Sequence, residues 1–159
     1  MGNKQMYSIK VIDDKDKKRE ITRVVLEALP DWFGVEESRE SYIRESADIL
    51  MVAAFDQDRP IGFICLQETG KDTIELHVMG VLMEYHRKGV GKELFKEAKE
   101  IAAKSGYSFM QVKTVKMGVY EDYDRTNLFY QSLGFKEFEV FPLLWDELNP
   151  CQIYVMSLK

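Results

Sequence analysis

The sequence has few of the features that mark secreted, membrane-spanning or metal-binding proteins. Only two of its 159 residues are cysteines, Cys65 and Cys151, so no disulfide framework is implied and we expect a reducing, cytoplasmic compartment. Two histidines and scattered acids offer no metal-ligand spacing, and no metal is expected. No apolar run is long enough to span a bilayer, and Met1–Met6 lacks a signal-peptide core. We therefore expect no membrane association.

An excess of positive charge is also lacking. The chain has 22 Lys and Arg against 27 Asp and Glu, a formal net charge of −5. A general nucleic-acid binder would carry a basic face and a high pI, so no nucleic-acid partner is expected. The acidic balance favours a cationic substrate. Length and an apolar content of 45% predict one domain over residues 1–159 with a sizeable core, without repeats or linkers.

The most informative segment is Glu84–Lys92, which lies between an apolar strand-like run and an amphipathic helix. Its two glycines, Gly89 and Gly91, let backbone N–H groups converge on one point. The following helix directs its positive dipole end to the same point. Further donors come from four side chains: His86, Arg87, Lys88 and Lys92. This combination predicts a site for a phosphate or pyrophosphate.

The spacing of this loop excludes two common phosphate-binding motifs. A Walker A loop needs glycine at position 86 and Ser or Thr after Lys92, where His86 and Glu93 stand. A dinucleotide-binding fingerprint needs a third glycine at position 94, where Leu94 stands. The remaining pattern, His86–Gly91, resembles the R/Q-x-x-G-x-G/A loop of the GNAT superfamily of acetyl-CoA-dependent N-acetyltransferases. In that family the loop binds the pyrophosphate of coenzyme A. His86 replaces the usual Arg or Gln and can also donate a hydrogen bond.

A second segment, Thr126–Phe135, resembles the GNAT pattern N-x-x-A-x-x-x-Y-x-x-x-G-F. Tyr130 and the Gly-Phe corner are retained, whereas Thr126 stands where Ala is common and Tyr123 where Asn is common. The resemblance implies a coenzyme A contact from the usual Asn, and Tyr123 lacks the amide that makes it. With the phosphate loop upstream, the resemblance covers nearly the whole chain.

The order of the elements predicts a mixed α/β (α+β) fold in a single GNAT-like domain. It has a central mixed sheet of about seven strands and about four helices, and the resemblance implies a splay between the fourth and fifth strands. Hydrophobic periodicity predicts strands over 7–12, 49–55, 61–67, 73–82, 109–115, 136–141 and 152–158, and helices over 17–29, 36–48, 89–105 and 124–133.

The resemblance implies how acetyl-CoA, the expected cosubstrate, would be held. Its pantetheine arm would pair with strand backbone over Met79, Gly80, Val81, Leu82 and Met83, where one N–H can also polarise the thioester carbonyl. Gly80 suggests a bulge or a close backbone approach within this strand. The pyrophosphate would bind the loop residues His86, Arg87, Lys88, Gly89, Val90, Gly91 and Lys92.

Three residues are catalytic candidates. The resemblance implies that Tyr130 protonates the departing thiolate, which suits a phenol titrating near ~10 beside a thiol near ~8.5. The alternative is a buried aromatic on the helix face. A general base is needed because the pKa of an ammonium is near ~10, so little free amine is present at neutral pH. Glu75 and His77 lie on one face of their strand and are the candidates. Either could take the proton directly or through water. Glu75 is favoured because its position resembles one that is often acidic in the family.

The acceptor pocket is expected from segments that vary within such folds. Trp32 and Phe33 lie in a short link between helices. Trp145 and Asn149 lie in Phe141–Cys151, interpreted as a long loop that forms a lid or pocket wall. The alternative for this loop is a hydrophobic plug over the sheet.

Together these features predict an N-acetyltransferase that moves acetyl from acetyl-CoA to an amine by direct attack. The amine could belong to a small molecule or to a protein. Two alternatives remain open: a non-catalytic acyl-CoA-binding regulator on the same fold, and a homodimeric interaction module whose aromatic loops form the interface.

Overall fold

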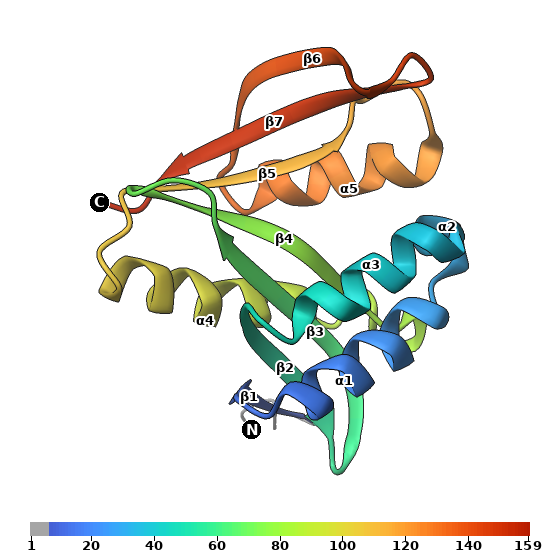
Figure 1. The fold of residues 1–159 in the computed structure, drawn as a ribbon, viewed down its shortest axis with the longest axis vertical. Coiled ribbons are helices and arrows are strands. Elements are labelled where there is room, and N and C mark those ends of the chain that lie inside the picture. Colours follow the sequence, from blue (N-terminus) through green and yellow to red (C-terminus); the bar gives the residue numbers. More distant parts are fainter. Residues whose placement is uncertain (1–6) are drawn as a thin grey trace. The chain divides into compact units, whose positions relative to one another are not determined.

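The computed structural model describes residues 7–159 (Figure 1). The segment 1–6, where the sequence shows no signal-peptide core, lies outside the described residues. The strands are β1 Ser8–Ile12, β2 Leu50–Asp56, β3 Arg59–Glu68, β4 Thr73–Val81, β5 Phe109–Val115, β6 Lys136–Asp146 and β7 Asn149–Ser157. The helices are α1 Lys15–Glu27, α2 Pro30–Phe33, α3 Glu36–Ser46, α4 Val90–Lys104 and α5 Glu121–Ser132, with a 3₁₀ turn at Met83–Tyr85.

The strands form a seven-stranded mixed sheet in the order β1-β2-β3-β4-β5-β7-β6. β4 and β5 run parallel, and their paired register covers only Thr73–Leu76 against Phe109–Val112. Both strands continue beyond that register, which agrees with the expected splay. The predicted mixed α/β fold is confirmed. Within residues 7–159 there are five helices instead of about four, because Pro30 starts the extra short helix α2.

The chain divides into two compact units, which we describe separately. The first unit comprises the described part of Met1–Leu66 together with Val78–Glu100. The second comprises Gln67–His77 and Ile101–Lys159. Strand β4 thus contributes its first half to the second unit and its last residues to the first.

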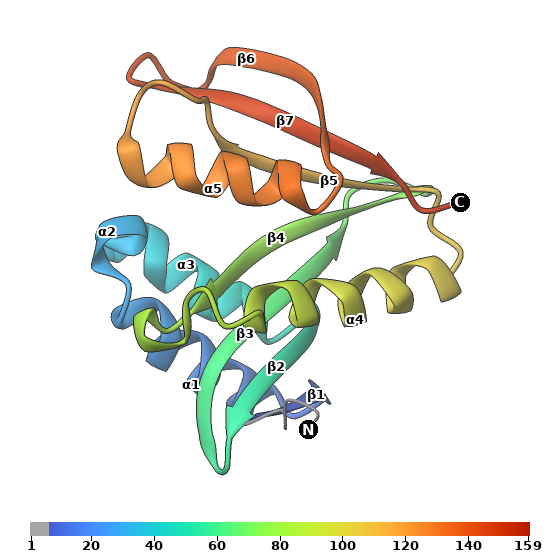
Figure 2. The same cartoon turned by 180° about the vertical axis from the view of Figure 1, so that it is seen from behind.

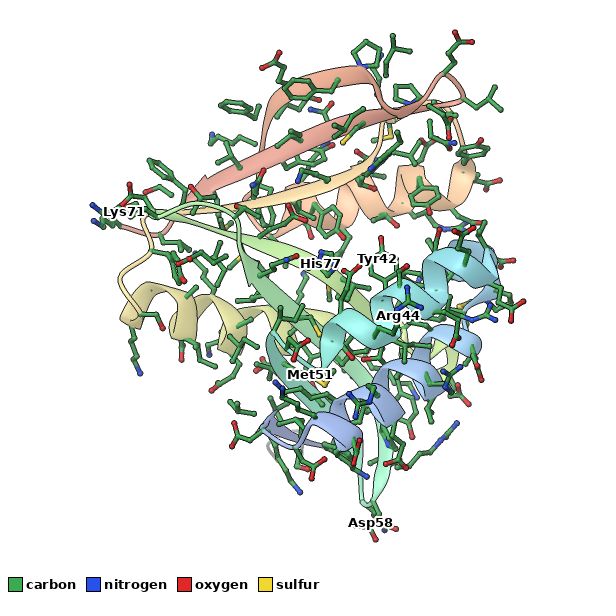
Figure 3. The ribbon with its side chains drawn as sticks, in the orientation of Figure 1. Tyr42, Arg44, Met51, Asp58, Lys71 and His77 are labelled. Carbon is green, nitrogen blue, oxygen red and sulfur yellow. The ribbon has the colours of Figure 1, made fainter. Side chains whose placement is uncertain are left out.

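The first unit carries helices on both faces of its strands. α1 and α3 lie on one face and α4 on the other (Figures 1 and 2). α1 begins at its N-cap Asp14, whose side chain accepts from the N–H of Lys17, and it buries residues at helical spacing: Ile21, Val25 and Leu26. Strands β2 and β3 are near-continuous apolar runs because both of their faces are covered. Their hairpin carries Asp58 at its tip (Figure 3).

Gly80 is explained by the packing of α1 against β4. A Cβ at this position would lie 3.0 Å from Val25 Cγ1 and 3.0 Å from Leu29 Cδ1. Any larger residue would force these two side chains to shift. Of the two interpretations of Gly80, this packing supports the close approach.

The second unit is built on β5, β7 and β6, with α5 packed along one face (Figures 1 and 2). Lys71 lies in the turn that precedes β4 (Figure 3). The core of this unit includes Met110, Val112, Tyr130, Phe135 and Tyr154. β6 is an edge strand of the sheet, and its side chains are exposed except for the half-buried Val140.

The predicted long loop over Phe141–Cys151 is wrong. This segment continues the β6–β7 hairpin, in which only Glu147 and Leu148 separate the strands. Pro142 lies where the pairing register shifts between Phe141 and Asp146. A proline is tolerated at such an irregularity on an edge strand.

Candidate active site

The predicted phosphate loop links β4 to α4 within the first unit. Leu82 is buried, and its N–H donates to the Ile61 carbonyl at 2.9 Å, which fixes the end of β4 to β3. The Met83–Tyr85 turn and the loop follow, and α4 begins at Val90. The strand, loop and helix therefore stand in the order that the sequence predicted.

The backbone of this loop turns twice into the left-handed region. Arg87 has φ 61° and Gly89 has φ 83°, conformations that are costly for a non-glycine residue. The first helical bond runs from Glu93 N–H to the Gly89 carbonyl at 3.1 Å. The N–H groups of Val90, Gly91 and Lys92 therefore have no acceptor within the helix. Such an arrangement of donors suits an anion.

The side chains of the loop divide into an anchor and three cations. His86 Nε2 lies 2.6 Å from the Val81 carbonyl oxygen, so the imidazole holds the loop to the end of β4. Arg87, Lys88 and Lys92 are exposed, and their charges can reach a phosphate. The structure thus gives His86 a contact with the strand that sequence reasoning did not anticipate.

Trp32 brings helix α2 to this loop. Its ring contacts the His86 ring edge-on, with centroids 6.0 Å apart. Phe33 contacts Tyr42 of α3 with centroids 5.9 Å apart. Of the two predicted acceptor-pocket residues of the first unit, Trp32 therefore lies beside the phosphate loop, and Phe33 packs against α3.

A charged cluster in the second unit surrounds Glu75. This side chain is only 8% exposed. Its Oε1 accepts from Lys113 Nζ at 2.7 Å, and its Oε2 faces His77 Nδ1 at 3.6 Å. Burial by itself would raise the pKa of Glu75, but the interactions with His77 and Lys113 outweigh it and lower the pKa below its usual value. Glu75 is therefore a carboxylate at neutral pH.

Lys113 was not identified from the sequence. It lies 38 residues from Glu75 in the chain, and the register of two parallel strands brings them together. One signal was available. The strand 109–115 is largely apolar but carries Gln111 and Lys113 at alternate positions, so both side chains lie on one face of the strand. A buried Glu75 on the neighbouring strand would need a polar partner on that face.

The lowered pKa of Glu75 predicts a pH-dependent contribution to stability. A carboxylate whose folded pKa lies below its unfolded value, near ~4.3, stabilises the fold above that value and loses this contribution as the pH falls through the folded pKa. We expect Glu75→Gln to lower the melting temperature at pH 7 and the difference from wild type to shrink below about pH 4. Thermal unfolding from pH 3 to pH 7 measures this. A difference independent of pH would contradict the ion pair.

Tyr130 lies on α5 and is 7% exposed. Its ring neighbours are Phe129, Phe135 and Tyr154, with centroids 5.9 to 6.4 Å away. Tyr130 therefore lies on the buried face of its helix, and its catalytic role stays a prediction.

A buried amide that sequence reasoning missed fixes α5 to two strands. Asn127 is fully buried, and its Nδ2 donates to the Val115 carbonyl of β5 at 2.8 Å. Its Oδ1 accepts from the Tyr154 hydroxyl of β7 at 2.6 Å. Helical spacing from Tyr123 and Tyr130 could have placed Asn127 on the inner face of the helix. These bonds define the position of the helix that carries Tyr130.

The other two predicted acceptor residues lie at the end of the β6–β7 hairpin. Trp145 is 45% exposed. Asn149 donates from Nδ2 to both carboxylate oxygens of Asp146, at 2.8 and 3.1 Å, and so closes the turn. Cys151 is fully buried, and burial raises the pKa of its thiol to about 11, which leaves it protonated at neutral pH.

Residues 7–159 have neither a membrane-spanning helix nor a cluster of metal ligands. No helix there is long and apolar enough to cross a membrane. In the same residues, no group of His, Cys, Asp or Glu is placed to hold a metal ion.

The strand-loop-helix site and the mixed sheet agree with a family match. The family of GNAT acetyltransferases matches residues 18–135, which is most of the chain. The protein belongs to this family. No curated protein is similar enough in sequence to count as a match.

Several solved structures share the fold. A protein from Desulfovibrio desulfuricans, assigned to the GNAT family, superposes with a TM-score of 0.83 at 16% identity over 96% of this chain and 99% of that chain. An aminoglycoside 6'-N-acetyltransferase complexed with coenzyme A gives 0.73 at 21% identity over 96% and 97%. The ribosomal-protein-S18-alanine N-acetyltransferase of Escherichia coli gives 0.74 at 15% identity over 97% and 95%.

Proposed function

We propose that this protein is an acetyl-CoA-dependent N-acetyltransferase that transfers acetyl directly to an amine. The observation that carries the proposal is the loop before α4. There, backbone turns at Arg87 and Gly89 precede three N–H groups without helical acceptors. Family membership supports the same conclusion, as does the coenzyme A bound by a structural neighbour.

The residues of the first unit suit the cosubstrate. The loop N–H groups and the side chains of Arg87, Lys88 and Lys92 would hold the pyrophosphate. The backbone of Met79–Met83 would pair with the amides of the pantetheine arm. Acetyl-CoA supplies the acetyl group as an activated thioester.

In the second unit we assign the base to His77 and a positioning role to Glu75. Glu75 has one oxygen on Lys113 and the other facing His77, and a carboxylate with a lowered pKa holds a proton poorly. Imidazole is the side chain best suited to accept a proton near neutral pH. Glu75 faces Nδ1 and so directs Nε2 as the accepting nitrogen.

The proposed reaction is a direct transfer of acetyl from sulfur to nitrogen. The amine nitrogen forms a bond to the acetyl carbonyl carbon, the carbon–sulfur bond breaks, and the electron pair leaves on sulfur. The proton of the amine passes to His77, directly or through water. The sulfur takes a proton from the Tyr130 hydroxyl. The proton held by His77 is released to solvent, and the Tyr130 phenolate takes a proton from solvent, so both groups regain their starting states.

A pH–rate comparison separates the two candidate bases. With the true acceptor, we expect His77→Gln to lower kcat/KM by about 100-fold near pH 7 and by less near pH 10, because free amine is then abundant. Glu75→Gln should lower kcat/KM by less, because the Glu75 carboxylate acts only by positioning His77. The measurement is kcat/KM from pH 6 to pH 10 for wild type and both variants. If Glu75→Gln shows the larger pH-dependent defect, Glu75 is the base and the assignment to His77 is wrong.

The proposed function is tested by a screen of amine acceptors with acetyl-CoA, in which released thiol is detected. Acetyl-CoA binding without thiol release on any acceptor would favour the acyl-CoA-binding regulator. Concentration-dependent size without acetyl-CoA binding would favour the homodimeric interaction module. The exposed apolar residues of the hairpin end, Leu143, Leu144, Trp145 and Leu148, are where that interface would form.

A further inference from the structure

Strand β6 of the second unit exposes apolar side chains of the kinds that folded proteins usually bury. α5 packs on β5 and β7 through Asn127 and Tyr130, whereas every residue of β6 is exposed except the half-buried Val140. β6 lies at the rim of the unit in both views (Figures 1 and 2). Adjacent exposed apolar side chains mark a site of interaction. Those of the β6–β7 hairpin are Phe138, Phe141, Leu143, Leu144, Trp145 and Leu148.

The same hairpin carries negative charge without a basic residue to offset it. Residues 137–158 contain no lysine or arginine. Asp146 accepts hydrogen bonds from the Leu148 N–H and the Asn149 amide, which are uncharged groups, so its charge is not neutralised. The hairpin therefore joins an apolar surface to a negative one. Its four carboxylates, all exposed, are Glu137, Glu139, Asp146 and Glu147.

The backbone of β6 limits how a partner can bind. β6 is an edge strand, so one side of its backbone is open to another strand. Pro142 has no N–H to donate and lies where the pairing register shifts between Phe141 and Asp146. A continuous added strand would be interrupted there. A partner would therefore dock mainly on the exposed side chains of the hairpin.

Charge decides which kind of partner suits this surface. In a two-fold dimer the same patch faces itself, and like charges placed together are unfavourable. β6 contains one basic residue, Lys136, against three carboxylates, so a second copy of the chain cannot compensate the charge of the strand. Nucleic acids and anionic membranes are repelled for the same reason. A polypeptide that carries lysine or arginine beside apolar side chains matches both the charge and the apolar surface.

We propose that the β6–β7 hairpin is a docking surface for a basic, amphipathic polypeptide segment. The apolar side chains of the segment cover those of the hairpin, and its lysines or arginines face the four carboxylates. Electrostatic attraction also speeds the encounter of the two chains. This inference goes beyond the proposed acetyltransferase function and does not depend on it.

The test measures binding of labelled synthetic peptides by fluorescence anisotropy, without acetyl-CoA. The first peptide has lysine and leucine at helical spacing. A second replaces each lysine by glutamate, and a third replaces each leucine by serine. We expect the first peptide to bind wild type, with an affinity that falls as salt is added. The second should not bind, and the third should bind at least about 10-fold more weakly, because it has no apolar side chains to bury.

Two double variants remove the two features of the surface separately. Leu143 and Leu148 are 69% and 75% exposed, so serine at both positions should leave the fold intact. It should weaken binding of the first peptide by about 10-fold or more. Leu128→Ser is the matched control, since it removes an exposed leucine from α5 in the same unit and should leave binding unchanged.

Glu139→Gln with Glu147→Gln should also weaken binding of the first peptide and reduce its salt dependence. The control is Glu97→Gln with Glu100→Gln, which removes the same charge from exposed positions of α4. This control should bind as wild type does, which separates the hairpin from the net charge of the chain. Melting temperatures show that each variant is folded.

Three results would overturn the inference. These are no binding of the first peptide to wild type, equal binding by wild type and both hairpin variants, and equal binding of the lysine and glutamate peptides. A concentration-dependent dimer that the Leu143→Ser, Leu148→Ser variant abolishes would also overturn it, because the hairpin would then belong to a second copy. Since no acetyl-CoA is present, these results leave the proposed acetyltransferase function untouched.

Discussion

Replacing Tyr130 by phenylalanine should lower kcat by about 100-fold or more, while the affinity for acetyl-CoA stays nearly unchanged. The hydroxyl is expected to act when the thiolate leaves, and a positioned general acid contributes on this scale. The ring itself remains, so its packing against Phe135 and Tyr154 should be retained. Steady-state kinetics with the true acceptor, together with acetyl-CoA binding by calorimetry, measure the two quantities separately.

Tyr107→Phe is the control for this variant. It removes a phenolic hydroxyl from the same unit, one that donates to Glu68 Oε1 at 2.6 Å and lies outside the proposed machinery. Its kcat should equal that of wild type. An unchanged kcat in a folded Tyr130→Phe protein, with the chemical step shown to be rate-limiting by single-turnover kinetics, would remove Tyr130 from the mechanism.

Acetyl-CoA should raise the melting temperature, and Gly89→Val or Gly91→Val should abolish this rise. At about 100 times Kd a ligand stabilises by about 2.7 kcal/mol, which corresponds to roughly 5 to 10 °C for a domain of this size. Valine would prevent the pyrophosphate from approaching the loop backbone. The rise in melting temperature should decrease with added salt, because part of the attraction between the loop and the phosphates is electrostatic. Free pantetheine, which lacks the pyrophosphate, should stabilise far less.

Gly106→Val is a matched control for Gly89→Val. Both glycines have positive φ, 95° and 83°, and at both positions a Cβ would meet no atom within 4 Å. Each valine should therefore destabilise the free protein by a similar amount, roughly 1–2 kcal/mol. Only Gly89→Val should lose the response to acetyl-CoA. A normal response in a folded Gly91→Val protein, or equal stabilisation by pantetheine and acetyl-CoA, would mean that the phosphates bind elsewhere.

Local patterns explain the parts of the fold that were predicted correctly. Periodicity placed each strand and long helix of residues 7–159 with the right type, and most boundaries agree within a few residues. The phosphate loop was predictable because its strand, glycines and helix are adjacent in the sequence. The exception among the elements is Phe141–Cys151. That segment was interpreted as a loop because it mixes apolar and polar residues, although it continues the β6–β7 hairpin, and Pro142 lies in the edge strand β6 where the register shifts.

Most contacts that define the candidate sites join residues far apart in the sequence, so they could not be predicted from local sequence patterns. Lys113 pairs with Glu75 across 38 residues, and this contact altered the choice of base. Asn127 could be recognised as an anchor only after its partners Val115 and Tyr154 were known. The bond from Arg39 Nη1 of α3 to the Phe33 carbonyl could not be predicted, since an arginine on a charged helix is usually solvated.

The sequence by itself determined the fold class, the family resemblance and the position of the phosphate loop, because hydrophobic period and glycine spacing act over a few neighbouring residues. Tertiary structure decided which charges meet. The register of β4 with β5 placed Lys113 on Glu75, and the packing of α3 on α2 placed the Arg39 guanidinium on the Phe33 carbonyl. Such pairings depend on register and packing between distant segments, and a charge has the same letter in the sequence whether it is solvated, paired or free to bind a ligand.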